Sequence, residues 1–291
     1  MELFNVVLGS IYFLSASVLL FLNASLITTF VKNREYRTTT YLLIKHICFS
    51  GIMQLVAFIG GSFMTILQSN IDPKLERVLG ALIQAGWFLY LGLSLALAVD
   101  RLLMFLFSKP VRFSRIVSRV FLFVSWLLSL IVFVILLLPG FAFNYAGQRF
   151  YLWAYSTHRH SKIMQKVEYF TDPITFGVIF FIYMVVVVYL IKLKRSVAVT
   201  NLNFSKETRI LVTAFVSFVY ESLFTSLNYW GTESPEYRFA TKIAVNQGWI
   251  VNSGLFAIMS LAMNRRLRER VLRLVVRKKS VRIVSTLKVS K

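Results

Sequence analysis

Long apolar runs separated by short polar stretches dominate the pattern of this 291-residue chain. Each run is between 21 and 29 residues long, which is enough for a helix to cross a hydrocarbon layer of roughly 30 Å. Lipid offers no water to backbone groups, so each run is expected to be an α-helix. The pattern therefore predicts an all-α membrane protein, a seven-transmembrane helix bundle. The predicted spans are Val6–Phe30, Tyr41–Leu67, Leu79–Phe107, Val117–Phe141, Tyr169–Ile191, Ile210–Trp230 and Phe239–Met263.

Lysine and arginine are distributed unevenly over the two sides of these predicted spans. The connections after the first, third and fifth runs, together with the C-terminal tail, carry a net charge of +20. The N-terminus and the other connections, among them the long loop Ala142–Glu168, carry +2 when Lys242 at the outer edge of the last run is counted with them. Because strongly basic loops stay in the cytoplasm, we expect a plasma-membrane protein with its N-terminus extracellular and its C-terminus cytoplasmic.

The stretch after the last run repeats its apolar residues at helical spacing. Residues 264–279 place Leu267, Val271, Leu274 and Val275 on one face, against eight lysines and arginines. Such a basic amphipathic helix is typical of a segment held on the inner leaflet by anionic lipid. A calmodulin-type target is the alternative. We therefore divide the chain into a helix bundle (1–263), this juxtamembrane helix (264–279) and a disordered cytoplasmic tail (280–291).

Composition supports a membrane protein and argues against several functions. The chain is 57% hydrophobic, with a mean hydropathy of +0.68. A net charge of +21 would suggest nucleic acid in a soluble protein, but here the basic residues lie between apolar runs, so no nucleic-acid partner is expected. One cysteine, Cys48, and three histidines provide no convincing metal site. Neither a catalytic cluster nor a glycine-rich phosphate loop is present, so we expect no enzyme and no cofactor. Lys242, at the outer edge of the last run, is too far out to bind retinal.

An ionisable pair, Asp100-Arg101, lies near the end of the third run. At that depth a charged pair is costly unless it is paired or hydrated, so it marks a candidate functional site. One helical face about 100° wide holds Gln84, Trp87, Leu91, Ser94, Ala98 and Arg101. We interpret this face as the connection between an outer polar and aromatic cluster and the inner arginine. A snorkelling arginine preceded by an incidental aspartate is the alternative.

The sixth and seventh runs carry polar stripes as well. Glu221 lies midway along the sixth run and shares a face with Ser217, Thr225 and Asn228. A buried carboxylate is neutral, paired with a cation or exposed to a hydrated cavity. Glu221 therefore either contacts a ligand or forms a structural hydrogen bond between helices. In the seventh run Trp249 shares a face with amide and small side chains, so it either walls a pocket or packs tightly.

The topology, the Asp-Arg pair and the basic eighth helix together resemble a G-protein-coupled receptor. A closer resemblance is to the nematode chemosensory receptors of serpentine receptor class T, with class X as the second choice. Gly86-Trp87, Val99-Asp100-Arg101, Phe143-Asn144 and Asn246-Gln247-Gly248-Trp249 are similar to motifs of class T. The resemblance covers most of the chain, and it implies the rhodopsin-like receptor architecture and no enzymatic activity.

The chain also departs from the usual receptor pattern. Ser50-Gly51 stands where receptors usually carry an aspartate in the second span, so a sodium site is doubtful. Phe256 replaces the usual proline of the seventh span. With one cysteine, the disulfide that usually ties the third span to the second outer loop cannot form. The usual activation switches are therefore not expected to transfer unchanged.

The resemblance and the topology predict a chemosensory receptor. A small-molecule chemical ligand would bind from outside, and a heterotrimeric G protein would bind on the inner face, where Asp100 and Arg101 would form the coupling switch. The expected ligand-binding residues are Gln84, Trp87, Tyr90, Glu221, Asn228 and Trp249. The alternative is a small membrane transporter or channel subunit, in which Glu221 and Arg101 would lie on a conduction route.

Overall fold

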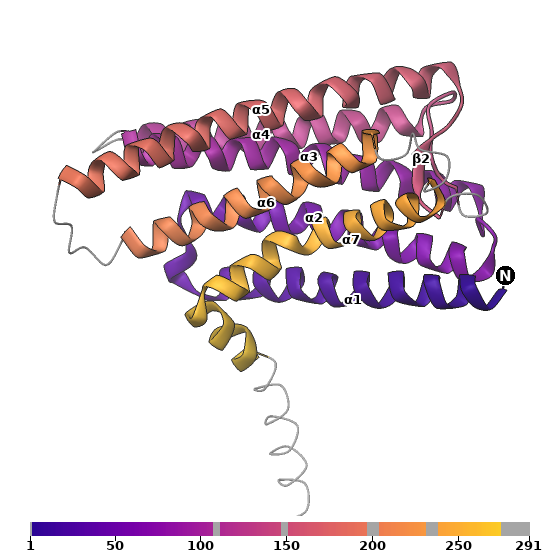
Figure 1. Cartoon of the computed structure of the whole chain (residues 1–291), viewed down its shortest axis with the longest axis horizontal. Coiled ribbons are helices and arrows are strands. Elements are labelled where there is room, and N and C mark those ends of the chain that lie inside the picture. Colours follow the sequence, from indigo (N-terminus) through magenta and orange to yellow (C-terminus); the bar gives the residue numbers. More distant parts are fainter. Residues whose placement is uncertain (1, 107–110, 147–150, 197–203, 231–237, 275–291) are drawn as a thin grey trace, which may run out of the picture.

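Seven long helices form one bundle in the computed structural model, which describes residues 2–106, 111–146, 151–196, 204–230 and 238–274 (Figure 1). The elements are α1 (Glu2–Lys32), the 3₁₀ turn η1 (Arg34–Tyr36), α2 (Thr39–Leu67), α3 (Pro73–Leu106), α4 (Val111–Leu137), β1 (Phe143–Tyr145), β2 (Trp153–Tyr155), α5 (Arg159–Ser196), α6 (Phe204–Trp230) and α7 (Arg238–Met263). Residues 265–274 form a further short helix. The predicted seven-helix bundle is confirmed.

The two ends of the bundle differ in what they carry. The N-terminus and the strands β1 and β2 lie at one end, which we call the hairpin end (Figure 1). Residues 265–274 leave α7 at the opposite end (Figure 1). Arg101, near the C-terminal end of α3, contacts Thr40 in the first turn of α2, and we call this end the arginine end.

Most of the bundle surface is apolar, as a lipid environment requires. Five helices, α1 to α5, are long and apolar enough to cross a membrane by length and composition. Phe123 and Phe181 each leave 69% of their surface exposed, and Leu223 leaves 62%. α6 and α7 run beside these helices in the same bundle (Figure 1). Side chains of this size on so many outward faces are stable against lipid rather than water.

The connection between α2 and α3 follows from local backbone chemistry. Gln68 adopts a left-handed conformation (φ 51°) and ends α2. The carboxylate of Asp72 then accepts hydrogen bonds from the backbone nitrogens of Lys74 (2.8 Å) and Leu75 (2.9 Å). These nitrogens have no partner within a helix, and Pro73 in the first turn lacks an N–H that would need one. The turn therefore starts α3 at a defined residue.

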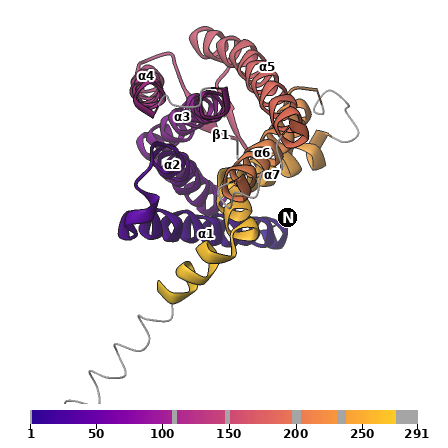
Figure 2. The same ribbon diagram turned by 90° about the vertical axis from the view of Figure 1, so that its left-hand side faces the viewer.

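Helix α3 occupies the centre of the bundle and packs against α2, α4, α5, α6 and β1 (Figure 2). α1 and α2 pack against α7 on another side of the bundle. At that junction the amide of Asn23 donates to the Ser253 carbonyl at 3.2 Å, and a Cβ on Gly51 would lie 2.2 Å from the same oxygen. The backbone of α7 therefore occupies the space that a side chain at position 51 would need, which explains why an aspartate does not fit there.

The segment between α4 and α5 differs from the predicted loop Ala142–Glu168. It contains an antiparallel hairpin, in which Phe143 pairs with Tyr155 and Tyr145 pairs with Trp153. α5 starts at Arg159, ten residues before the predicted span, and includes Glu168. The prediction of a solvated loop is therefore wrong for Glu168, which is buried. The first turns of α5 are too polar for a hydropathy pattern to detect, although their buried residues recur at helical spacing.

Residues 265–274 pack back against the turn between α1 and α2. Leu267 and Val271 are buried, and the Arg270 guanidinium lies 5.4 Å from the ring centroid of Tyr36 and forms an ion pair with Glu35. Burial raises the pKa of Tyr36 to about 12, against the opposing effect of the Arg270 charge, so the phenol stays neutral at physiological pH. The rest of the predicted juxtamembrane helix, residues 275–279, and the predicted tail, 280–291, lie outside the described residues.

Candidate functional site

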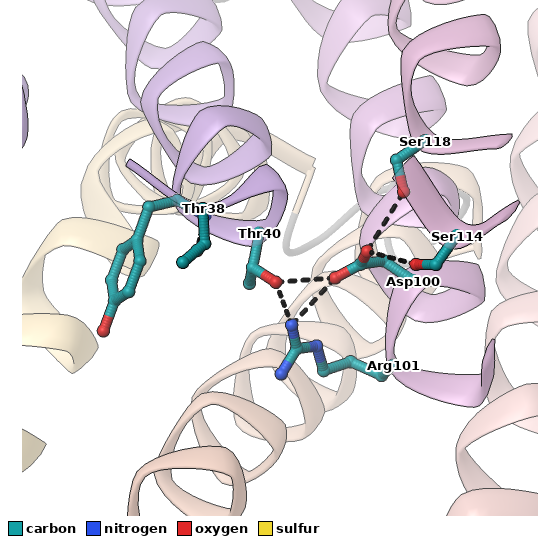
Figure 3. Close-up of polar contacts among 7 residues, drawn as sticks. Thr38, Thr40, Asp100, Arg101, Ser114 and Ser118 are labelled. Carbon is teal, nitrogen blue, oxygen red and sulfur yellow. Dashed lines mark hydrogen bonds and ion pairs between the residues drawn. The ribbon is translucent and has the colours of Figure 1, made fainter. Parts of the chain in front are cut away.

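Four polar side chains surround Asp100 at the arginine end, and together with Asp100 we call them the Asp100 network (Figure 3). One carboxylate oxygen of Asp100 accepts from the Thr40 hydroxyl at 2.7 Å and from the Arg101 guanidinium at 2.8 Å. The other oxygen accepts from the Ser114 hydroxyl at 3.2 Å and the Ser118 hydroxyl at 3.0 Å. Arg101 also donates to Thr40. The network consists of Thr40, Asp100, Arg101, Ser114 and Ser118.

The Asp100 network joins three helices through one carboxylate. Thr40 belongs to α2, the Asp-Arg pair to α3, and the two serines to α4. Asp100 and Arg101 are each 1% exposed, so a snorkelling arginine is the wrong description. A carboxylate has about four lone-pair sites, and four donors occupy them here. The charge is therefore fully satisfied, which a buried ion pair requires.

Nearer the hairpin end, α3 donates to three further buried acids. The Gln84 amide donates to Glu168 at 3.0 Å, the Trp87 indole to Asp172 at 3.3 Å, and the Tyr90 hydroxyl to Glu221. Because their donors follow one another along α3, the three acids Glu168, Asp172 and Glu221 are arranged one after the other beside this helix. We call them the acid column. Glu168 and Asp172 lie on α5 and Glu221 on α6. The donors from α3 to these acids are neutral groups, in contrast to the arginine beside Asp100.

A cavity of about 110 Å³ opens above the acid column, between the hairpin and helices α3, α5, α6 and α7. We call it the hairpin cavity. Its aromatic walls are Phe143, Trp153, Tyr155 and Trp249. Its polar walls include Gln84, Glu168, Asn228 and Asn246. A largely buried, aromatic-walled cavity with a few convergent polar groups is the usual form of a small-molecule site.

Trp249 connects the cavity to the helices beneath it. Its indole nitrogen donates to the Gln54 carbonyl oxygen of α2 at 2.8 Å. Its ring meets Trp87 edge to face at 5.9 Å, and Trp87 stacks on Tyr90 at 5.9 Å. Aromatic contacts of this kind transmit a displacement from one ring to the next, because packed rings cannot compress.

The hairpin is held over the cavity by non-covalent contacts to α3. The Glu76 carboxylate accepts from the backbone nitrogen of Tyr145 at 2.8 Å. The Arg77 guanidinium donates to the carbonyl of Phe141 at 3.1 Å and to that of Leu138. A Cβ on Gly80 would lie 1.7 Å from the Phe143 carbonyl oxygen, so the β1 backbone lies directly on α3. These contacts occupy the place of the disulfide that a single cysteine cannot form.

The six predicted ligand-binding residues form one connected group. Gln84, Asn228 and Trp249 line the hairpin cavity. Trp87, Tyr90 and Glu221 do not line the cavity. Trp87 contacts Trp249 of the cavity wall and stacks on Tyr90, which donates to Glu221. Their role in ligand binding stays a prediction. The predicted switch residues, Asp100 and Arg101, lie at the opposite end of α3, within the Asp100 network.

Sequence reasoning missed several residues of this site. Gln54 and Asn246 are amides within apolar runs, a signal that could have assigned both to the site. Glu168 and Asp172 were counted only as charges, although Ser161, Met164, Glu168 and Asp172 form the buried face of one helix. The hairpin residues had no pattern to reveal them, because strands of three residues are too short to show a period.

The comparisons with known proteins agree with this geometry. Residues 2–284 match the family described as serpentine-type 7TM GPCR chemoreceptor Srt. No curated protein matches the chain. Among solved structures, the crystal structure of squid rhodopsin is similar in fold, with a TM-score of 0.74 and 15% identity over 93% of this chain and 85% of that one. The chain therefore belongs to the Srt family of serpentine seven-transmembrane chemoreceptors, the class that its motifs predict.

Proposed function

We propose that this receptor binds an extracellular small molecule in the hairpin cavity and signals to a cytoplasmic heterotrimeric G protein through the arginine end. In this arrangement the N-terminus and hairpin are extracellular, the C-terminus is cytoplasmic, and the bundle spans the plasma membrane. The uneven distribution of basic residues supports this orientation.

One observation carries the proposal: a single helix, α3, contributes both to the cavity and to the Asp100 network. Gln84 lines the cavity, Trp87 and Tyr90 lie beneath it, and Arg101 is buried at the far end of the same helix. Each of the three upper residues donates to α5 or α6. A ligand that binds one arrangement of these helices more tightly shifts the population towards it, and a shift of α3 strains the bonds that join it to α2 and α4.

Anionic lipid of the inner leaflet is the further partner in this proposal. Residues 265–274 bury Leu267 and Val271 and expose the arginines on the other side of the helix. The exposed arginines are Arg265, Arg266, Arg268 and Arg273. Exposed cations beside the inner leaflet are attracted to phosphate headgroups, which would fix the angle at which this helix leaves α7.

The test is Arg101→Ala in cells that express the full receptor and a second-messenger reporter. A panel of volatile small molecules first identifies an activator of the unmodified receptor. Asp100 keeps its three hydroxyl donors in the variant, so we expect surface expression to persist. We expect loss of activator-driven signalling. Arg159→Ala, which changes an exposed arginine at the start of α5, is the control and should signal normally.

Signalling by Arg101→Ala at the unmodified level would contradict the proposed role of the Asp100 network. Activator-dependent solute or ion flux in vesicles without G protein would instead favour a transporter or channel subunit. The two measurements separate the coupling mechanism from the class of protein.

A further inference from the structure

The hairpin cavity contains buried acceptors that lack donors. Gln84 is fully buried and Asn246 is 2% exposed. Neither side-chain oxygen has a hydrogen-bond partner among the described residues. Both residues line the cavity. Because buried polar atoms are nearly always paired, these two oxygens point to a ligand that supplies donors.

The orientation of the Gln84 amide is fixed by its neighbour. Its nitrogen donates to the Glu168 carboxylate at 3.0 Å. Beside a bound cation Glu168 is ionised and only accepts, so exchanging the amide nitrogen and oxygen would then bring two acceptors together. The oxygen of Gln84 therefore has to face elsewhere, and the donor it needs must come from the cavity.

Glu168 adds a carboxyl group to the same wall. It is 8% exposed, and the neutral Gln84 amide donates to it. The nearest lysines along α5, Lys162 and Lys166, are exposed to the surroundings instead. Asp172 and Glu221 continue the acid column below, again with neutral donors from α3. Beside a bound cation these carboxyl groups ionise, so the wall favours a cationic ligand over an anionic one.

Aromatic rings form the rest of the wall around this charge. Phe143 meets Tyr155 edge to face at 4.8 Å and Trp249 at 6.1 Å. Trp153 lies nearly parallel to Phe143, with ring centroids 6.5 Å apart. The faces of such rings attract organic cations, and most strongly where water is excluded. A neutral apolar ligand would fit the rings but would leave the acceptors of Gln84 and Asn246 unpaired.

We propose that the hairpin cavity selects a small organic cation, a protonated amine, whose ammonium group is bound by Glu168, Gln84 and Asn246 within the aromatic wall. This inference rests on the proposed function as a receptor for small molecules and specifies the ligand class. A cavity of about 110 Å³ holds several water molecules' worth of space, so the ligand is a short-chain amine rather than a peptide.

The single cysteine provides a direct assay for binding. Cys48 is 1% exposed and is the chain's one cysteine, so a thiol-reactive dye reports unfolding of the bundle. The full receptor in lipid nanodiscs is heated with a panel of small primary and quaternary amines, each matched with a neutral alcohol and a carboxylate of the same size. We expect the unfolding temperature to rise with at least one amine and to stay unchanged with its matched partners.

Variants of the wall then test the assigned residues. Glu168→Gln should weaken the apparent affinity for the stabilising amine at least about tenfold, the effect of one charge-assisted hydrogen bond. Asn246→Asp, which adds a second carboxylate, should tighten it. Glu269→Gln, which changes a carboxylate at the arginine end, should leave the affinity unchanged. The gain expected for Asn246→Asp keeps the test valid even where Glu168→Gln fails to fold.

The proposal is overturned if no amine stabilises the receptor, if neutral or acidic compounds stabilise it more than amines, or if Asn246→Asp weakens amine binding. The second-messenger assay keeps this separate from the proposed function. Amines that bind through Glu168 without G-protein activation would support the ligand class and contradict signalling. Activation by compounds that are not amines would support signalling and contradict the ligand class.

Discussion

Two buried carboxylates in this receptor, Asp100 and Glu168, differ in how their charge is satisfied. Asp100 accepts from an arginine and three hydroxyls, which occupy both of its oxygens. Glu168 accepts from the neutral amide of Gln84. The first carboxylate is a completed structural centre. The second, beside a cavity and two unpaired amide oxygens, is a centre that a ligand can complete.

Burial alone therefore does not distinguish a carboxylate with a structural role from a carboxylate in a binding site. Asp100 is 1% exposed and Glu168 is 8% exposed, so both are removed from solvent. What differs is the number and charge of their donors. Removing a donor or acceptor should therefore be costly for stability at the arginine end, whereas at Glu168 it should be costly mainly for ligand affinity.

The largest effect is expected for Asp100→Ala. The substitution removes the described counter-charge of the buried Arg101 guanidinium and leaves its contact with the Thr40 hydroxyl. Breaking a buried pair in this way costs about 3–5 kcal/mol, so the unfolding temperature in nanodiscs should fall further than in Glu168→Gln. The thiol-dye assay at Cys48 measures both. Equal unfolding temperatures for the two variants would contradict the comparison.

A smaller loss is expected for Gly80→Ala at the hairpin end. The new methyl would lie 1.7 Å from the Phe143 carbonyl oxygen, which forces β1 away from α3 at a cost of about 1–3 kcal/mol. Chymotrypsin should then cleave faster after the hairpin aromatics, which are normally buried. Amine affinity should fall with it, because Phe143, Trp153 and Tyr155 would leave the cavity wall.

Gly177→Ala is the matched control for Gly80→Ala. Nothing lies within 4 Å of a Cβ at position 177, and alanine favours a helix over glycine by about 0.5–1 kcal/mol. The control should therefore be neutral or slightly stabilising. If both variants cleave at the same rate as the unmodified receptor, the hairpin is not held by its contact with Gly80.

Much of this fold could be predicted from sequence because lipid imposes one pattern on every span. Each of the seven apolar runs corresponds to one helix, and the Asp100-Arg101 pair was identified as a candidate site from the sequence. The partners of Asp100 could not be predicted, because Thr40, Ser114 and Ser118 are common surface residues that acquire a role only where three helices meet. Their positions depend on packing angles, which a run of apolar residues does not encode.

The binding end was less predictable for a related physical reason. Gln84, Asn228 and Trp249 stood out as polar or aromatic residues inside apolar runs, and they do line one cavity. Glu168 did not stand out, because it lies in the first turns of α5. These turns are polar, and a polar stretch between two apolar runs has the pattern of a loop. The hairpin was also hidden, since its position depends on Glu76, Arg77 and Gly80 of a different element.

The smallest effect that still separates the two carboxylates is expected for Ser118→Ala. The change removes one of four donors to Asp100 and leaves the Arg101 contact at 2.8 Å intact. A single hydrogen bond of this kind contributes about 1 kcal/mol, so the unfolding temperature should fall slightly and amine affinity should stay the same. Ser226→Ala is the control, because that hydroxyl donates to the Ser222 carbonyl within its own helix. A fall for Ser226→Ala as large as that for Ser118→Ala would mean that the loss at Ser118 does not come from its hydrogen bond to the carboxylate.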